Sequence, residues 1–441
     1  MVVRLEAAGA PADGAPSPSL AEATRIWARI GLLSFGGPAA QIALMHRILV
    51  DEKKWLTEAL YLNALSFCML LPGPEAMQLA TYAGWRLHGM RGGLAAGLLF
   101  VLPGASVVLA LSMIYAAFGR LPLVEALFFG IKAAVLVIVV EALLRISKRA
   151  LKGLAHWAIA GVSFLAIFFL ALPFPLIVLA AALLGFFRPG VASSDAGVTG
   201  PRPRLAARTL RVVALWLGIW FAPLALLAWV FGRGHVLTQL GWFFSKLAVV
   251  TFGGAYAVLA YMSQDVVVRY GWLQPGQMLD GLGLAETTPG PLILVTEFVG
   301  FIAAWQQSGG QAWMLGLLGA FVALWATFAP CFLWIFAGAP YIEWITRQPR
   351  LEGALKAITA AVVGVILNLA VWFALHVFFA KVTLIEWGAL KLWTPDVTTL
   401  DWRVVILAGL SAFLLLRRHW SIPSVLGLSA AFALGMRYLL S

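Results

Sequence analysis

The sequence predicts an all-α membrane protein that crosses the bilayer many times and is built from two homologous halves. The first reason is composition: hydrophobic residues make up 62% of the 441-residue chain and charged residues only 11%, whereas a soluble domain carries about 25% charged residues. Apolar runs such as "VLVIVVEALL" (Val135–Leu144) and "LIVLAAALLGFF" (Leu176–Phe187) recur along it, as membrane helices require. The formal net charge is +12. In a membrane protein the Lys and Arg residues that carry this excess are expected in cytoplasmic loops, so nucleic-acid binding is the weaker interpretation of the charge.

The second reason is an internal repeat. "SFGG" at Ser34–Gly37 returns as "TFGG" at Thr251–Gly254, and "PGP" at Pro72–Pro74 returns at Pro289–Pro291. Both matches have one offset of 217 residues (251 − 34 and 289 − 72). Several matches in one register indicate a duplicated fold. The same offset also relates Arg29 to Lys246, Trp55 to Trp272, and Gly92–Gly93 to Gly309–Gly310.

The repeat divides the chain into four parts. Residues 1–20 are rich in Ala, Pro and Gly and are expected to form a disordered tail, not a signal peptide. Residues 21–188 form the first repeat and residues 240–441 the second. Residues 189–239 hold a basic loop and a linker helix expected near 210–231.

The expected spanning helices number four in each half. The four spans of the first half and the linker helix make an odd number of membrane crossings before the second half begins. The second half should therefore be inverted relative to the first. Loop charge agrees: the turn at Trp305–Gln311 is uncharged, whereas its first-half counterpart contains Arg86 and Arg91, and Lys and Arg favour the cytoplasmic side. The spans are expected near 92–118, 122–144, 153–171 and 174–187, then near 312–336, 355–379, 401–416 and 421–439.

Each half opens with short apolar limbs that are broken by Gly and Pro. In the first half they lie near 24–36, 38–50, 57–71 and 74–89. Limbs of roughly 12–16 residues reach about 18–24 Å, short of the ~30 Å hydrocarbon core. Two re-entrant hairpins are therefore expected, with tips at Phe35–Pro38 and Leu71–Pro74.

Such tips are suited to anion binding. Proline has no N–H and fits the first turn of a new helix, as expected for Pro38, Pro74 and Pro291. A helix that begins inside the membrane exposes unpaired N–H groups and the positive end of its dipole. Broken helices at matching places in two inverted halves point to a transporter's substrate site. The alternative is that each Pro-Gly-Pro is only a packing kink.

Several side chains near the tips have two possible roles. Glu75 either caps its helix or carries a proton; its counterpart is Leu292, and the second half instead has Glu286 and Glu297. Arg29 and Lys246 either attract the anion or extend to the interface. Ser34 and Thr251 either donate their hydroxyls to the substrate or bond back to their own helices.

These motifs together resemble the chromate ion transporter family, in its two-domain form. The resemblance rests on "SFGGPAAQIALMHRILVDEKKWL" and "FCMLLPGPEAMQLATYAGW" in the first half, and on "TFGGAYAVLAYM" and "DGLGLAETTPGPLILVTEFVGF" in the second. One departure is Ala255, which stands where the first half has Pro38.

The resemblance implies a multi-pass secondary transporter of the inner (plasma) membrane that exports chromate and confers chromate resistance. Its partners would be chromate, sulfate as a related anion, and the lipid bilayer; a homodimer stays open, and no cofactor, metal or nucleic acid is expected. Transport of another oxyanion, such as sulfate or molybdate, and an anion channel are the alternatives. The absence of nucleotide-binding, zinc and nucleophile motifs disfavours an enzyme or an ATP-driven pump.

The expected substrate-binding residues follow from the tips and from the family's duplicated motifs. They are Ser34, Gly36, Gly37, Pro38, Pro72, Gly73, Pro74 and Glu75 in the first half, Thr251, Gly253, Gly254, Pro289, Gly290 and Pro291 in the second, and Arg29 and Lys246 beside the tips.

Overall fold

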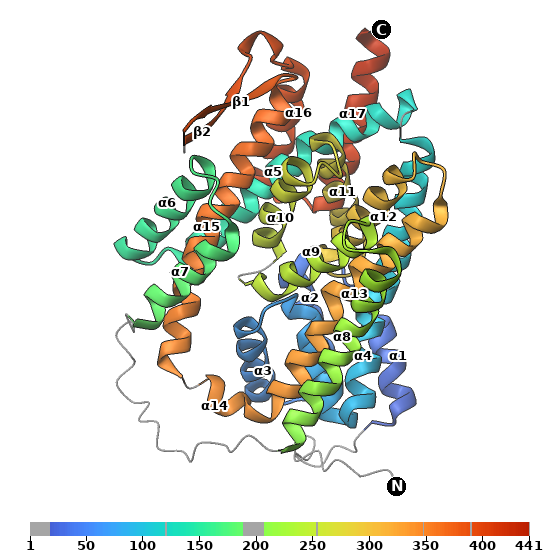
Figure 1. Ribbon diagram of the computed structural model, residues 1–441, viewed down its shortest axis with the longest axis vertical. Coiled ribbons are helices and arrows are strands. Elements are labelled where there is room, and N and C mark those ends of the chain that lie inside the picture. The colour runs from blue at the N-terminus through green and yellow to red at the C-terminus, as the bar shows by residue number, and fades with distance from the viewer. Residues whose placement is uncertain are drawn as a thin grey trace. The chain divides into compact units, whose positions relative to one another are not determined.

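A computed structural model describes residues 18–119, 121–187, 207–252, 255–346, 348–388 and 390–440 (Figure 1). The chain is mostly helical, which confirms the predicted all-α class. It forms two compact units, and each unit takes segments from both halves of the sequence. The first unit comprises Met1–Leu109, Val191–Gly254 and Thr288–Glu352; the second comprises Ala110–Gly190, Ala255–Thr287 and Gly353–Ser441. The predicted tail and the basic loop at 189–206 fall largely outside the described residues.

The first unit holds the elements that surround the predicted tips. In chain order they are α1 (Leu20–Leu33), α2 (Gly37–His46), the π-helical η1 (Arg47–Glu52), α3 (Glu58–Leu70), the first part of α4 (Glu75–Phe118), α8 (Ala207–Phe231), α9 (Val236–Val250), the 3-10 turn η3 (Leu292–Leu294), α12 (Val295–Gln307), α13 (Trp313–Gly338), η4 (Ala339–Tyr341) and α14 (Ile342–Thr346).

The second unit holds the end of α4 and most of the remaining spans. Its elements are α5 (Pro122–Ala150), α6 (Leu154–Phe168), α7 (Phe174–Phe187), α10 (Ala255–Gln264), η2 (Asp265–Arg269), α11 (Pro275–Thr287), α15 (Pro349–Phe378), β1 (Val382–Trp387), β2 (Leu390–Pro395), η5 (Val397–Thr399), α16 (Trp402–Ala412), η6 (Phe413–Arg417) and α17 (Ile422–Leu440).

The repeat seen in the sequence is also a repeat of elements. α1, α2, η1 and α3 return in the same order as α9, α10, η2 and α11. The bounds of α3 and α11 differ by 217 residues at both ends (275 − 58 and 287 − 70). Even the π-helical turn that ends α2 is repeated after α10. The inverted orientation of the second half stays a prediction.

The helices break where the sequence predicts. α1 ends before Ser34 and α2 begins at Gly37, and α3 ends before Leu71 and α4 begins at Glu75. In the second half, α9 ends before Thr251 and α11 ends before Thr288. Gly73 and Gly290 have φ angles of 119° and 93°, a backbone conformation that a residue with a Cβ rarely adopts. These glycines therefore allow the tight turns at the two Pro-Gly-Pro tips.

Six helices of the described chain are long and apolar enough to cross a membrane: α4, α5, α8, α13, α15 and α17. α6 and α7 contain 15 and 14 residues, about 22 Å, so α6 is shorter than the span expected near 153–171, whereas α7 has the expected bounds of 174–187. Their boundary lies at a turn in which Ala171 has a positive φ of 48° and Pro173 precedes α7. α4 has non-helical backbone at His88 and Gly89, close to the expected end of the fourth limb.

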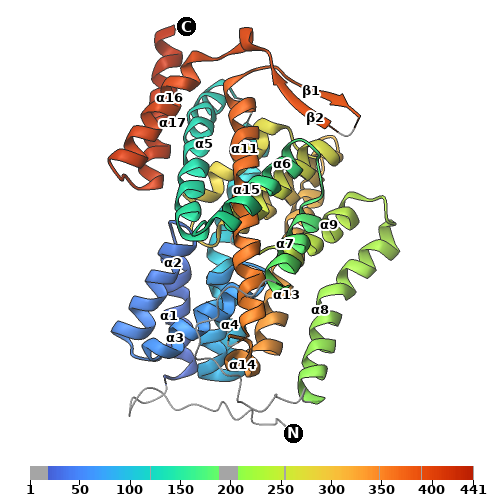
Figure 2. The same ribbon diagram turned by 90° about the vertical axis from the view of Figure 1, so that its left-hand side faces the viewer.

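Small residues set the helix packing in both units. In the first, a Cβ on Gly300 of α12 would lie 2.5 Å from the carbonyl oxygen of Gly319 in α13, and the reverse distance is 2.2 Å. In the second, a Cβ on Gly130 of α5 would lie 2.2 Å from the Ser429 carbonyl of α17; Figure 2 shows α16 and α17 beside α5. Glycine lets the helix backbones approach closely, as is common between membrane helices.

The β-hairpin was not expected from the sequence. β1 and β2 are antiparallel and pair Ile385 with Leu392 and Trp387 with Leu390. The Lys391 N–H donates a 2.7 Å hydrogen bond to the Phe169 carbonyl at the end of α6, and Figure 2 shows the hairpin beside that helix. The hairpin occupies the connection between α15 and α16, where the first half has only the short link from α5 to α6.

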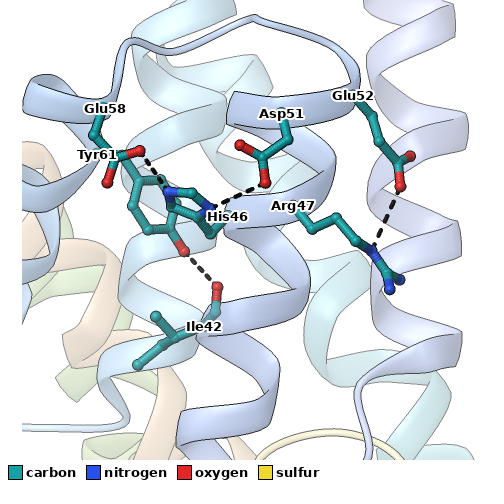
Figure 3. Close-up of polar contacts among 7 residues, drawn as sticks. All are labelled: Ile42, His46, Arg47, Asp51, Glu52, Glu58 and Tyr61. Atoms are coloured by element: carbon teal, nitrogen blue, oxygen red, sulfur yellow. Dashed lines mark hydrogen bonds and ion pairs between the residues drawn. The ribbon is translucent and has the colours of Figure 1, made fainter.

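A polar cluster connects the end of α2 to the start of α3 (Figure 3). His46 at the end of α2 has its Nε2 2.6 Å from Glu58 Oε2 and its Nδ1 3.4 Å from Asp51 Oδ2. The Tyr61 ring packs edge-on against the imidazole, and its hydroxyl donates to the Ile42 carbonyl at 2.7 Å. These contacts join α2 and η1 to α3.

Candidate functional site at the helix breaks

Three tips and Thr251 lie within the first unit and are joined by backbone hydrogen bonds between the halves. The Gly73 N–H donates to the Thr251 carbonyl at 2.9 Å, and the Gly290 N–H donates to the Ser34 carbonyl at 2.7 Å. The two bonds are equivalent under the repeat, because the offset is 217 residues for both partners (290 − 73 and 251 − 34). A contact that recurs with its partners exchanged is the pattern that a twofold axis produces.

A buried glutamine strengthens one of these two contacts. Gln41 of α2 is fully buried, and its Nε2 donates to the Gly290 carbonyl at 2.6 Å and to the Ser34 carbonyl at 3.3 Å. Its repeat position, Val258 (41 + 217), has no donor. The tip at Phe35–Pro38 (the first tip) is therefore held to the tip at Pro289–Pro291 (the fourth tip) by a side chain as well as by backbone.

A second buried glutamine supports the tip at Pro72–Pro74. Gln78 of α4 is fully buried and donates from Nε2 to the Pro72 carbonyl at 2.7 Å. A Cβ on Gly73 would lie 2.8 Å from this Nε2 and 3.1 Å from Cys331 Sγ, so the tip leaves no room for a side chain. The sequence interpretation missed both glutamines, although an amide in an otherwise apolar helix was an available signal.

The two hydroxyls at the tips are engaged by their own helices. Ser34 Oγ donates to the Ile30 carbonyl and Thr251 Oγ1 to the Leu247 carbonyl, both at 2.6 Å. Both residues are buried. Of the two roles considered for these hydroxyls, the structure shows the bond back to the helix.

The described tips differ in accessibility. At the first tip Gly36 is exposed, Gly37 is partly exposed, and a Cβ on Gly37 would meet nothing within 4 Å. Pro38 stands in the first turn of α2, and the start of this helix is partly exposed. Pro72, Pro74 and Glu75 are half-buried, and Glu75 is the first residue of α4.

The fourth tip is closed by comparison. Pro289, Gly290 and Pro291 are all buried. A Cβ on Gly104 of α4 would lie 2.2 Å from the Pro289 carbonyl oxygen, so α4 packs directly on this tip. Gly253 and Gly254 lie outside the described residues.

The two predicted cations lie on exposed parts of their helices. α1 buries Ala23, Trp27, Ile30 and Gly31, and Arg29 is exposed beside this face. Lys246 of α9 is likewise exposed. In the described chain no hydrogen bond or ion pair joins Arg29 to a tip residue.

Further buried charges belong to the second unit. Asp280 of α11 accepts from the Tyr115 hydroxyl at 2.8 Å and lies 3.4 Å from Lys132 Nζ. Glu286, near the end of α11, accepts from the Tyr256 hydroxyl at 2.8 Å. The repeat positions of these carboxylates in α3 are Asn63 and Met69. Among the residues that the structure describes, no group of three or more His, Cys, Asp and Glu side chains is arranged to hold a metal ion.

Comparison with known proteins identifies the family. The model of the chromate transporter family matches residues 21–186 and 238–436, one segment in each half. The chain belongs to the chromate transporter family. The chromate transporter relatives include the chromate transport protein of Cupriavidus metallidurans, which is 31% identical over 362 residues, 80% of this chain and 82% of that protein. This transporter is therefore a multi-pass protein of the plasma membrane.

Two other members of the family have similar coverage. The chromate transport protein of Pseudomonas aeruginosa is 34% identical over 77% of both chains. The probable chromate transport protein of Synechococcus elongatus is 30% identical over 80% of this chain and 84% of that protein. No solved structure matches this chromate transporter family member.

Proposed function

We propose that this protein is a secondary transporter that exports chromate from the cytoplasm, with the anion bound at the helix breaks of the first unit. The supporting observation is the pair of equivalent bonds Gly73–Thr251 and Gly290–Ser34. These bonds gather broken-helix tips from both halves in one compact unit. A helix that begins at a break offers unpaired N–H groups to an anion.

In this proposal the open tips make the first contact with the anion. The start of α2 at Gly37 and Pro38 and the start of α4 at Glu75 are partly exposed, whereas the tip at Pro289–Pro291 is buried. Opening of the buried tip would expose its N–H groups to the anion. The residues proposed from the sequence thus divide into a partly exposed set and a buried set.

The membrane potential is sufficient to drive export. Each charge that crosses the membrane contributes about 2.3 kcal/mol per 100 mV. A dianion therefore gains roughly 4.6 kcal/mol per 100 mV on leaving a cell with a negative interior, or about three powers of ten in concentration ratio. Chromate accumulation would require co-transported cations.

Uptake of labelled chromate by everted vesicles tests the proposal. We expect uptake that depends on an imposed inside-positive potential and that is absent from vesicles without the protein. Competition by sulfate or molybdate would rank the oxyanions. Vesicles preloaded with unlabelled chromate should take up label faster if the protein is a transporter, and a channel would show no such stimulation.

A further inference from the structure

Glu297 is a carboxylate inside the most completely buried helix of the first unit. It lies in the first turn of α12, in which every residue from Val295 to Ala304 is buried, and it is itself 1% exposed. The residues that precede it, from Thr288 to Leu294, are also buried. The side chain therefore has no contact with solvent in this conformation.

One oxygen of this carboxyl group also has no hydrogen-bond partner in the described chain. Glu297 Oε2 is buried without a hydrogen bond, and the neighbouring Thr296 hydroxyl donates to the Ile293 carbonyl instead. α12 packs on α13 and α9, whose only titratable side chains are Cys331 and Lys246. Cys331 Sγ donates to the Thr327 carbonyl, and Lys246 is exposed. An ionised carboxylate with an unpaired oxygen is strongly unfavourable in such surroundings, so burial favours the protonated form of this group.

The packing of the repeat does not require a carboxylate at this position. The equivalent residue in the first half is Ala80 (297 − 217), which is also fully buried. Glu297 follows Pro291 by six residues, about two helical turns from the occluded tip. A negative charge at that distance in a low-dielectric interior would repel a dianion at the tips.

We infer that Glu297 is the proton-binding residue whose protonation is linked to anion binding at the tips. This inference rests on the proposed oxyanion site and names its linked ion. The protonated form accepts the dianion, and by reciprocity a bound dianion favours protonation. Where the carboxylate is ionised, dianion binding draws one proton from solvent: an O–H bond of hydronium or of the buffer acid breaks as an O–H bond forms on Glu297, and no other covalent bond changes. Exchange of this proton with solvent requires the buried tip to open.

Anion binding as a function of pH tests the linkage. Labelled sulfate and labelled chromate would be bound to the purified protein in nanodiscs between pH 6 and 9.5. We expect the wild-type affinity to fall toward alkaline pH, by at most about tenfold per pH unit for one linked proton. Glu297→Gln keeps the shape and the neutral state, so its affinity should stay flat where the wild type falls. A merely structural glutamate would leave the two profiles parallel, and that result would overturn the inference.

Two controls make the result specific. Glu125→Gln removes an exposed carboxylate at the start of α5 and should keep the wild-type profile. If Glu297→Gln fails to insert, proton uptake by the wild-type protein is measured with a pH-indicator dye in weak buffer when sulfate is added at alkaline pH. Up to one proton per bound sulfate is expected, and the absence of uptake overturns the inference. Sulfate-linked uptake without chromate binding would instead reject chromate as the substrate and leave the role of Glu297 intact.

Discussion

The Gly73 N–H donates a 2.9 Å hydrogen bond to the carbonyl of Thr251, a residue that belongs to the other half of the repeat. The equivalent bond joins Gly290 to Ser34. Each Pro-Gly-Pro tip is thus attached to the hydroxyl-bearing residue that ends the first helix of the opposite half. Both bonds lie where the helices break, so a movement of one half relative to the other at these breaks acts on them directly.

Substitution of either tip glycine should therefore impair transport. Gly73→Ala forces a residue with a Cβ into a φ of 119° and places that Cβ 2.8 Å from Gln78 Nε2. Such strain costs about 1–3 kcal/mol, so we expect a lower melting temperature and a loss of most chromate uptake by everted vesicles. Gly290→Ala should behave alike, because its Cβ would lie 2.9 Å from Leu294 Cδ1.

The matched control for the glycines is Gly161→Ala in α6. Its φ is not positive, and a Cβ there would meet nothing within 4 Å. Transport and stability should stay at wild-type levels. Equal effects of the Gly161 and Gly73 substitutions would mean that the tip geometry has no special role.

Gln41→Leu should uncouple the first tip from the fourth. The change removes the donor to the Gly290 carbonyl and to the Ser34 carbonyl, and an unsatisfied buried acceptor costs about 1–3 kcal/mol. We expect a lower melting temperature in detergent and slower chromate uptake. Gln239→Leu is the control, because Gln239 makes the same type of bond, to the Gly234 carbonyl, at an exposed site. A Gln41 variant as stable and active as the Gln239 variant would contradict the proposed coupling.

The sequence was informative about the tips for a local reason. Pro and Gly determine where a helix can start and turn, so the breaks at Ser34, Leu71 and Thr288 could be read from residue types alone. Which tips meet depends on contacts between residues more than 170 positions apart, and no local pattern encodes that pairing. Gln41 was missed for the same reason, since its partner Gly290 lies in the other half.

The β-hairpin was missed although a local signal was present. The segment "VTLIEW" and the segment "LKLWTP" are rich in β-branched and aromatic residues and flank Gly388, which is a hairpin signal. In a chain this apolar, such short runs are difficult to distinguish from the ends of membrane helices. The correct distinction required the pairing of Ile385 with Leu392.

Arg29→Gln and Lys246→Gln test whether the two cations act on the anion. Both side chains are exposed, so their loss should not harm insertion. If they attract the dianion, each substitution should weaken chromate affinity severalfold, and the effect should decrease at high salt because exposed charges are screened. Wild-type affinity in both variants would exclude them from the site and leave the interfacial interpretation.

Paired reporter fusions test the inverted orientation of the halves. Met90 and Gln307 are equivalent under the repeat (307 − 90 = 217), and Arg86 and Arg91 flank only the first of them. By the positive-inside rule, a fusion after Met90 should report the cytoplasm and a fusion after Gln307 the outside. A fusion after Lys152 is the internal control and should report the cytoplasm. A cytoplasmic signal after Gln307 would reject the inverted arrangement.

Glu75→Gln and Pro74→Ala separate the roles of the tip that begins α4. Pro74 precedes the first helical residue and has no N–H, so Pro74→Ala allows the preceding backbone to become helical and to pair N–H groups that would otherwise face the anion. We expect this variant to insert normally but to lose chromate uptake.

Glu75 lies at the positive end of the helix dipole, where a carboxylate stabilises the helix by about 0.3–1 kcal/mol. If it only caps the helix, Glu75→Gln should reduce uptake modestly and keep the shape of the pH profile, in contrast to Glu297→Gln. Loss of the pH dependence in the Glu75 variant, with a wild-type profile in Glu297→Gln, would transfer the proton-linked role to Glu75.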